Sequence, residues 1–338
     1  MSVYILAIES SCDDTSAAVS CDNKILANLI ANQDIHQKYG GVVPELASRA
    51  HQQNIVPVID LALRSANINK NQLRAIAYTR GPGLLGSLLV GSSFAKALAL
   101  GLNVPLIEVD HMQGHILCHF IQNERGDQSM PRFPFLCLTI SGGHTQIVIV
   151  KDYFDMEVIG KTIDDAAGEA FDKTAKILGL PYPGGPLVDQ YANDGNPHAY
   201  KLSVPRIAGL NYSFSGLKTS FLYLIRDELK KDSRFIEKNI HDLCASMQYA
   251  IVSSLMKKLI KASDETGIKE IAIAGGVSAN SLIRNELIKT GDALNWRTFI
   301  PPFTYTTDNA AMIAITAYFK YLKSEFTGFA AKPYTRSK

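Results

Sequence analysis

Residues 3–20, VYILAIESSCDDTSAAVS, and residues 135–150, FLCLTISGGHTQIVIV, share one layout. In each segment, an apolar run of strand character leads into a short polar tip and then into a second strand-like run. Each segment opens a stretch of chain long enough to form a lobe. We therefore expect a duplicated architecture, although hairpins of this kind also occur in α/β proteins without any duplication.

The rest of the chain alternates between strand-like and helix-like stretches, which is typical of an α/β protein. Residues 75–79 predict a strand, residues 87–100 a helix and residues 104–109 a further strand, which together form a βαβ unit. Another strand is expected at 270–274, with a helix from about Ser281.

Lobe boundaries follow from this pattern and from the polar, proline-flanked stretch 125–132. A helix is expected to begin at Asp164, where acidic residues suit the first turn. The predicted division is a first lobe over 1–131 completed by a helix at 308–322, a second lobe over 132–307, and a tail over 328–338.

The composition fits a large globular core, because 46% of the 338 residues are hydrophobic and 20% are charged. A net charge of +2 neither requires nor excludes a nucleic-acid partner, since phosphate binding needs only a local basic patch. The five cysteines are scattered without a C-x-x-C pair, which indicates a reducing compartment. No signal peptide and no membrane-spanning run are evident, so we expect a cytoplasmic protein with no membrane partner.

Two imidazoles lie four residues apart in the stretch 110–115, DHMQGH, directly after a strand-like run. On a helix, His111 and His115 would share one face and could reach one metal ion. The spacing alone is a weak signal, because His115 and His119 are also four apart and ordinary polar surface is the alternative. Asp308 precedes the last helix, where it is either an N-cap or an oxygen ligand. Two histidines and one carboxylate would leave open positions on a metal.

Three glycine-bearing loops could bind an anion, because glycine lets a backbone approach a ligand closely. They are residues 141–144, 183–186 and 275–280, and each is otherwise a tight turn. Neither a Walker A sequence nor a Rossmann glycine fingerprint is present. Glu169 and Asp172 share a helix face, from which a carboxylate could accept ribose hydroxyls; solvated charge is the alternative.

With these motifs in order, the sequence resembles the TsaD family, the tRNA N6-adenosine threonylcarbamoyltransferases. The resemblance runs from residue 3 to about residue 320. It implies a two-lobed, actin-like ATPase (ASKHA) fold. The motifs that carry the resemblance are residues 8–15, 40–49, 81–84, 111–115, 141–145, 164–174, 182–186, 213–219, 274–280 and 307–310.

The resemblance implies that threonylcarbamoyl-adenylate gives its acyl group to N6 of the adenosine 3′ of a tRNA anticodon, with release of AMP. It assigns a divalent metal, Fe²⁺ first and Zn²⁺ second, to His111, His115 and Asp308. Asp110 and Gln113 stand where other members can carry His and Glu, but these are not the ligand positions. The resemblance assigns the adenylate to Thr139, Ile140, Ser141, Gly142, Gly143, Asp172, Gly185, Asp189 and Asn280.

Proton transfer and partners are less defined by the sequence. Glu9 and Asp13, at the first hairpin tip, are candidates for proton transfer, and burial or capping is the alternative for both. The resemblance also implies a paralogous TsaB-like subunit and a small TsaE-like ATPase as partners. Basic residues that could guide tRNA phosphates are Lys201, Arg206, Lys332 and Arg336.

Three other functions fit the sequence less well. A nucleotide-dependent kinase or ATPase of the same fold would not need the histidine pair. A metalloprotease is disfavoured because H-E-x-x-H is absent. A non-catalytic scaffold would not need intact ligand positions.

Overall fold

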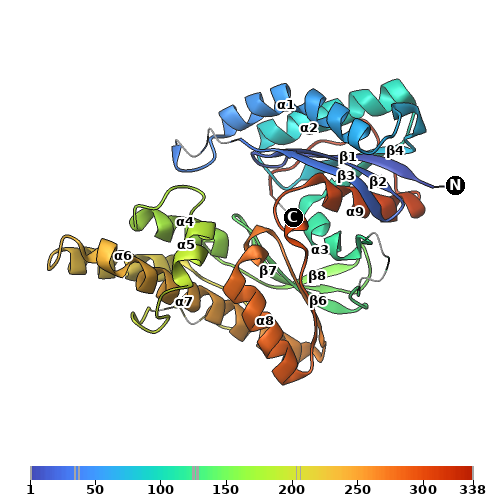
Figure 1. The fold of residues 1–338 in the computed structure, drawn as a ribbon. Coiled ribbons are helices and arrows are strands. Elements are labelled where there is room, and N and C mark those ends of the chain that lie inside the picture. Colours follow the sequence, from blue (N-terminus) through green and yellow to red (C-terminus); the bar gives the residue numbers. More distant parts are fainter. Residues whose placement is uncertain are drawn as a thin grey trace. The chain divides into compact units, whose positions relative to one another are not determined.

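The computed structural model describes residues 2–33, 36, 39–123, 126, 129–202, 204–205 and 207–336. The chain divides into two compact units, one formed by residues 1–130 with 302–338 and the other by residues 131–301 (Figure 1). Each unit has its own sheet, so the two units are described one at a time.

The first unit contains a mixed five-stranded sheet in the order β3-β2-β1-β4-β5. β1, β2 and β3 form an antiparallel meander, whereas β4 and β5 run parallel to β1. Buried aliphatic side chains fill β1 and β4, which is typical of central strands. The strands are β1 (Tyr4–Glu9), β2 (Thr15–Cys21), β3 (Lys24–Ala31), β4 (Ala75–Gly81) and β5 (Leu106–Asp110).

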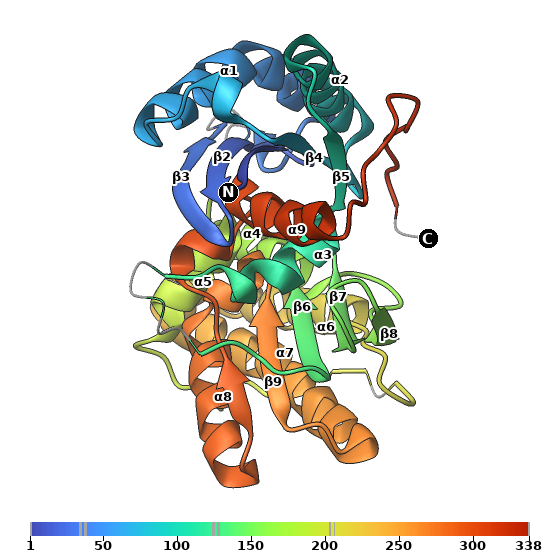
Figure 2. The same cartoon turned by 90° about the vertical axis from the view of Figure 1, so that its right-hand side faces the viewer.

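Helices cover both faces of this sheet. α1 and α2 pack on one face, and α9 packs on the other, as Figure 2 shows. The short helix α3 follows β5 without a loop and packs against α9. The elements are α1 (Pro44–Ser65), α2 (Leu85–Leu102), α3 (His111–Leu117), α9 (Ala310–Leu322) and the 3₁₀ turns η2 (Lys70–Gln72), η3 (Cys118–Phe120) and η5 (Phe303–Tyr305).

The second unit repeats the topology of the first. Its sheet has the order β10-β9-β6-β7-β8, with an antiparallel meander of three strands and two further strands parallel to β6. The expected α/β fold with two duplicated, actin-like sheet lobes is therefore confirmed. The strands are β6 (Phe135–Ile140), β7 (Thr145–Val150), β8 (Met156–Lys161), β9 (Glu270–Ala274) and β10 (Arg297–Phe299).

The helices of the second unit enclose a large hydrophobic core. The long helix α7 supplies many of its side chains, among them Leu243, Met247 and Leu255. The elements are α4 (Ala167–Ile177), α5 (Gly184–Ala192), α6 (Ser215–Leu229), α7 (Phe235–Thr266), α8 (Ser281–Leu294) and the 3₁₀ turn η4 (Gly276–Ala279).

Two local expectations are wrong. The helix expected from Asp164 begins at Ala167, because the Asp164 carboxylate accepts hydrogen bonds from the Phe214 amide (2.8 Å) and the Ser213 hydroxyl at the start of α6.

The second expectation is that no run of residues can span a membrane. Among the described residues one helix, α2, is long and apolar enough to do so. Core helices pass the same test, and one side of α2 packs on α1 and β4.

Candidate functional site

The two histidines of the 110–115 stretch occupy one face of α3. Asp110, the last residue of β5, is the N-cap of α3: its Oδ1 accepts hydrogen bonds from the amides of Met112 (2.9 Å) and Gln113 (3.0 Å). This cap starts the helix at His111, so that His115 follows one turn later. The two imidazole ring centroids are 4.7 Å apart.

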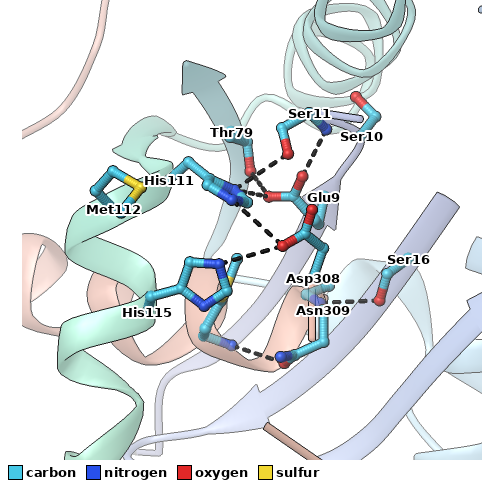
Figure 3. Close-up of polar contacts among 12 residues, drawn as sticks. Glu9, Ser10, Ser11, Ser16, Thr79, His111, Met112, His115, Asp308 and Asn309 are labelled. Carbon is cyan, nitrogen blue, oxygen red and sulfur yellow. Dashed lines mark hydrogen bonds and ion pairs between the residues drawn. The ribbon is translucent and has the colours of Figure 1, made fainter. Parts of the chain in front are cut away.

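Asp308 faces these imidazoles, as Figure 3 shows. It does not cap α9; Asn309 does, through its Oδ1, which accepts a hydrogen bond from the Met312 amide (3.2 Å). The Asp308 side chain is thereby left for another role. Its Oδ1 lies 3.3 Å from Nε2 of His111 and 3.2 Å from Nε2 of His115. Segments almost two hundred residues apart in the sequence thus meet within the first unit.

The donor set fits a transition-metal ion. One ligand atom from each of His111, His115 and Asp308 lies within 4.8 Å of the other two. His115 is fully buried, His111 is 7% exposed, and the Asp308 side chain is 29% exposed, which leaves the cluster open at the carboxylate. Two imidazoles and one carboxylate suit Fe²⁺ or Zn²⁺ and leave coordination positions free.

Electrostatics inside the cluster favour charged side chains. Burial alone would raise the pKa of Asp308, but His111 and His115 lower it well below its usual range. Burial would likewise lower the pKa of His111, but the carboxylates of Asp308 and Glu9 raise it well above its usual value. The imidazolium form of His111 and the two carboxylates therefore stabilise one another.

Glu9 orients His111. Its Oε2 lies 3.3 Å from Nδ1 of His111 and accepts a hydrogen bond from the Thr79 hydroxyl, while its Oε1 accepts one from the Ser11 amide. The Ser11 hydroxyl is 3.1 Å from the same His111 nitrogen. Because Nδ1 is engaged in this way, Nε2 of His111 is the nitrogen directed toward Asp308.

Ser11 and Thr79 were missed by sequence reasoning. A signal for Thr79 existed, since Glu9 ends β1 and Thr79 lies near the end of its parallel neighbour β4. The carboxyl ends of parallel strands share one edge of the sheet.

Asp13 lies at the tip of the same hairpin as Glu9, next to the Cys12 thiol. Burial raises the pKa of Cys12, and the negative charges of Asp13 and Asp308 raise it further. The hairpin tip is held by His51 of α1, whose ring nitrogens lie 2.7 Å from the Thr15 hydroxyl and 3.0 Å from the Cys12 carbonyl oxygen. A role for Asp13 in proton transfer stays a prediction.

The second unit presents an exposed glycine hairpin tip between β6 and β7. The Ser141 amide donates to the His144 carbonyl oxygen (2.8 Å), and the His144 amide donates to the Ser141 hydroxyl (3.1 Å). Gly142 and Gly143 are exposed, and a Cβ on either would contact nothing within 4 Å. Thr139 and Ile140 are fully buried in β6, so neither residue is exposed near this tip.

Asp172 connects α4 to the start of α5. Its Oδ1 accepts hydrogen bonds from the amides of Gly184 (2.9 Å) and Gly185 (3.2 Å). A Cβ on Gly184 would lie 2.2 Å from the Ala175 Cβ, so glycine permits this close approach of the helices. Burial raises the pKa of Asp172, and the two amides partly offset that effect.

Asp189 and Asn280 both brace the start of α8. Asp189 accepts hydrogen bonds from the amide (3.0 Å) and the hydroxyl (2.7 Å) of Ser281. Asn280 caps α8 by accepting from the Ile283 amide (3.1 Å), and its Nδ2 donates to Gln248 of α7 (3.0 Å). Their side-chain polar groups are thus engaged within the second unit.

Residues 24–315 match the family described as TsaD: tRNA N6-adenosine threonylcarbamoyltransferase. The chain belongs to this family. Its sequence is 63% identical over 336 residues to the tRNA N6-adenosine threonylcarbamoyltransferase of Christiangramia forsetii, covering 99% of this chain and 98% of that protein. It is 61% identical to the protein of the same name from Riemerella anatipestifer over 96% of this chain and 95% of that one. Members of the TsaD family are transferases, so the chain is an enzyme.

Solved structures of distant proteins share the fold. HypF from T. kodakarensis superposes with a TM-score of 0.63 at 16% identity, over 96% of this chain and 49% of that one. Component A of the (R)-2-hydroxyglutaryl-CoA dehydratase of Acidaminococcus fermentans superposes with a TM-score of 0.53 at 16% identity, over 96% and 99% of the two chains. At such low identity, these likenesses show the fold alone.

Proposed function

We propose that this TsaD-family transferase moves the threonylcarbamoyl group of threonylcarbamoyl-adenylate to N6 of the adenosine 3′ of the anticodon in tRNA, with release of AMP. The proposal rests on family membership together with one observation: His111, His115 and Asp308 converge on one point, with His111 oriented by Glu9. A kinase or ATPase of the same fold would not need that cluster.

The metal would be held by Nε2 of His111, Nε2 of His115 and the Asp308 carboxylate. A divalent ion there, Fe²⁺ first and Zn²⁺ second, supplies a Lewis acid that orients and polarises the carbonyl to be transferred. The chain's own contribution is to fix its ligands before the substrate arrives. Glu9 and Ser11 hold His111 in place, and the cap at Asp110 sets the register of α3.

The adenylate would bind to the second unit. Since Oδ1 of Asp172 accepts both glycine amides, we propose that its Oδ2 accepts the ribose hydroxyls. The exposed backbone of Gly142 and Gly143 suits the phosphate, because open amide groups attract anions. Gly185, in the first turn of α5, adds to the same surface.

Four further residues expected at the adenylate have narrower roles in this proposal. Thr139 and Ile140 are fully buried in β6, so in this proposal they support the β6–β7 tip and do not contact the adenylate. Asp189 and Asn280 hold the start of α8 in position, since their polar groups already bond within the unit.

Proton removal from the adenine amine is the second requirement of the reaction. The exocyclic amine is a weak nucleophile, so the reaction depends mainly on activation of the electrophile, the threonylcarbamoyl carbonyl. We propose that Glu9 is not the base, because it is fully buried and its oxygens contact Ser11, Thr79 and His111. Asp13, partly exposed on the hairpin tip, is the candidate that we retain for proton transfer.

The tRNA would be guided by basic residues. Lys201 lines a hollow of about 730 Å³ on α7, together with Lys257, Lys258 and the exposed ring of Tyr249. Lysines could contact phosphates there, and an exposed aromatic ring could stack on an unpaired base. Lys332 and Arg336 are exposed on the tail, whereas Arg206 lies outside the described residues.

Protein partners would bind the first unit. Five large apolar side chains are exposed on α1 and α2, and an open groove runs between these helices. We propose that a paralogous, TsaB-like subunit covers this face, because apolar patches of this kind mark protein interfaces. We also propose that a small TsaE-like ATPase is a partner and that the protein is cytoplasmic. The exposed side chains are Val56, Leu61, Leu85, Leu89 and Leu100.

The decisive experiment compares His111→Ala with His241→Ala, which removes an imidazole outside the cluster. Each purified chain is loaded with Fe²⁺ or Zn²⁺, its metal content is measured, and transfer to tRNA is assayed with adenylate and the partner subunits. The proposal predicts loss of metal and of transfer in His111→Ala alone. Full metal occupancy and full transfer in that variant would refute it.

A further inference from the structure

The tail after α9 follows the edge of the first sheet. The Thr327 amide donates to the Leu106 carbonyl oxygen (2.8 Å), and the Glu108 amide donates to the Thr327 hydroxyl (3.0 Å). Figure 2 shows this segment, in dark red, beside β5. Because β5 is an edge strand, the tail satisfies backbone groups that would otherwise remain open.

Arg80, at the end of β4, holds the far end of the tail. Its Nε donates to the Lys332 carbonyl oxygen (2.8 Å), and its own carbonyl oxygen accepts from the Tyr334 amide (3.2 Å). The guanidinium group also lies over the Tyr334 ring, 5.7 Å from its centroid. Gly81 has φ +154°, and a Cβ there would lie 2.1 Å from the Tyr334 carbonyl oxygen. A glycine is therefore needed for the tail to pass, and Tyr334 is held in one place.

The Tyr334 side chain reaches the helix that carries the histidines. Its hydroxyl donates a hydrogen bond of 2.5 Å to Oδ2 of Asp110, whose Oδ1 caps α3. Burial raises the pKa of Tyr334, and the Asp110 charge raises it further, so the hydroxyl keeps the proton that it donates. One carboxylate thus connects the tail to the first turn of α3.

We propose that Tyr334 is a positioning residue for the metal ligands: its hydroxyl fixes the Asp110 carboxylate, which in turn sets the start of α3 and the orientation of His111 and His115. The inference rests on the metal site of the proposed function. α3 spans only seven residues, and a helix of that length depends on its cap and its packing for a fixed register. Loss of the Tyr334 contact would remove the hydrogen bond that holds Oδ2 of Asp110 and would leave the cap held by its two backbone contacts alone.

The test uses Tyr334→Phe, which removes one hydroxyl, and Tyr321→Phe as its control. Tyr321 packs its ring on Phe326 of the same tail, 5.7 Å between centroids. Zn²⁺ affinity is measured by calorimetry on the full-length, metal-free chain. Tyr334→Phe should weaken binding about tenfold, the low end of the effect of removing groups behind metal ligands. Tyr321→Phe should bind as the unaltered chain does.

A second readout does not need the metal. Amide hydrogen exchange at Met112 and Gln113, the two amides that Asp110 caps, should become faster in metal-free Tyr334→Phe and stay unchanged in Tyr321→Phe. If the unaltered chain binds no Zn²⁺, the proposed metal site is refuted. Amide hydrogen exchange then still tests whether Tyr334 fixes the start of α3. Unchanged exchange and unchanged affinity in Tyr334→Phe would overturn the inference.

A double variant shows whether Tyr334 acts through Asp110. Asp110→Ser keeps a capping oxygen but shortens the side chain that Tyr334 reaches. Adding Tyr334→Phe to Asp110→Ser should then change Zn²⁺ affinity no further, because the two residues act in series. An additional tenfold loss in the double variant would show that Tyr334 acts by another route and would contradict the inference.

Discussion

Glu9 lies 3.3 Å from Nδ1 of His111, although 102 positions separate the two residues in the sequence. The contact joins the end of β1 to the first residue of α3, and it leaves Nε2 of His111 directed toward Asp308, where we propose the metal. A carboxylate behind a ligating histidine fixes the ring and strengthens the ligand. This pair gives a fully buried carboxylate at the end of a central strand a cationic partner when His111 is protonated, and an imidazole to orient when it is not.

Glu9→Gln should weaken metal binding by about tenfold or more, because a neutral amide orients and polarises His111 less than a carboxylate. Calorimetry with Zn²⁺ measures this directly. Glu45→Gln, an exposed change on α1 at the Arg49 ion pair, is the matched control. Equal affinities in the two variants would remove the orienting role assigned to Glu9.

Asp172→Asn should weaken the binding of AMP or an adenylate analogue by roughly 1–3 kcal/mol, the usual effect of losing a hydrogen bond to a charged group. Asparagine retains an oxygen for the amides of Gly184 and Gly185, so the contact between α4 and α5 should persist. Glu169→Gln, beside it on the same helix, is the control because Glu169 pairs with Lys173 at 2.7 Å. Wild-type nucleotide affinity in Asp172→Asn would exclude the ribose contact.

His51 should make the metal-free chain less stable in acid. Burial lowers the pKa of His51 in the folded state, so the unfolded chain binds the proton more readily below about pH 6.5. The free energy of unfolding should therefore fall by up to about 1.4 kcal/mol per pH unit from this group as the pH drops through that value. Denaturant unfolding at pH 7.5 and at pH 5.5 measures this change. The free energy of unfolding of His51→Gln should fall less between the two pH values than that of the unaltered chain. An equal fall would mean that other groups cause the acid sensitivity.

Charge reversal at Lys201 and Lys257 should weaken tRNA binding and flatten its salt dependence. Each lost phosphate contact removes about 0.7–0.9 from the slope of log affinity against log salt. Adenylate affinity should not change, since neither lysine belongs to the nucleotide loops. A double variant, Lys201→Glu with Lys257→Glu, that keeps the wild-type slope would place the tRNA on another surface.

The sequence predicts the architecture better than it predicts the contacts of the site. The hairpins at 3–20 and 135–150 have a clear apolar pattern, and they do open two units of equal topology. The spacing of His111 and His115 predicts a shared helix face, which the structure has. The local sequence pattern therefore predicts single helices and strands and their repetition along the chain.

Contacts between distant segments have no such local signal. The position of Asp308 predicts either a helix cap or an oxygen ligand, and only the capping of α9 by the neighbouring Asn309 shows why its carboxylate is available. The use of Asp189 as a brace for Ser281 depends on how α5 packs against its neighbours. The bond from Tyr334 to Asp110 spans 224 positions, and no periodicity predicts it.

The most direct test of the central claim is anomalous diffraction at the iron and zinc absorption edges from crystals of the metal-loaded chain. The account predicts one peak within bonding distance, about 2.0–2.2 Å, of Nε2 of His111, Nε2 of His115 and the Asp308 carboxylate. A peak at other residues, or no peak at this cluster in a chain that carries a stoichiometric metal, would contradict it.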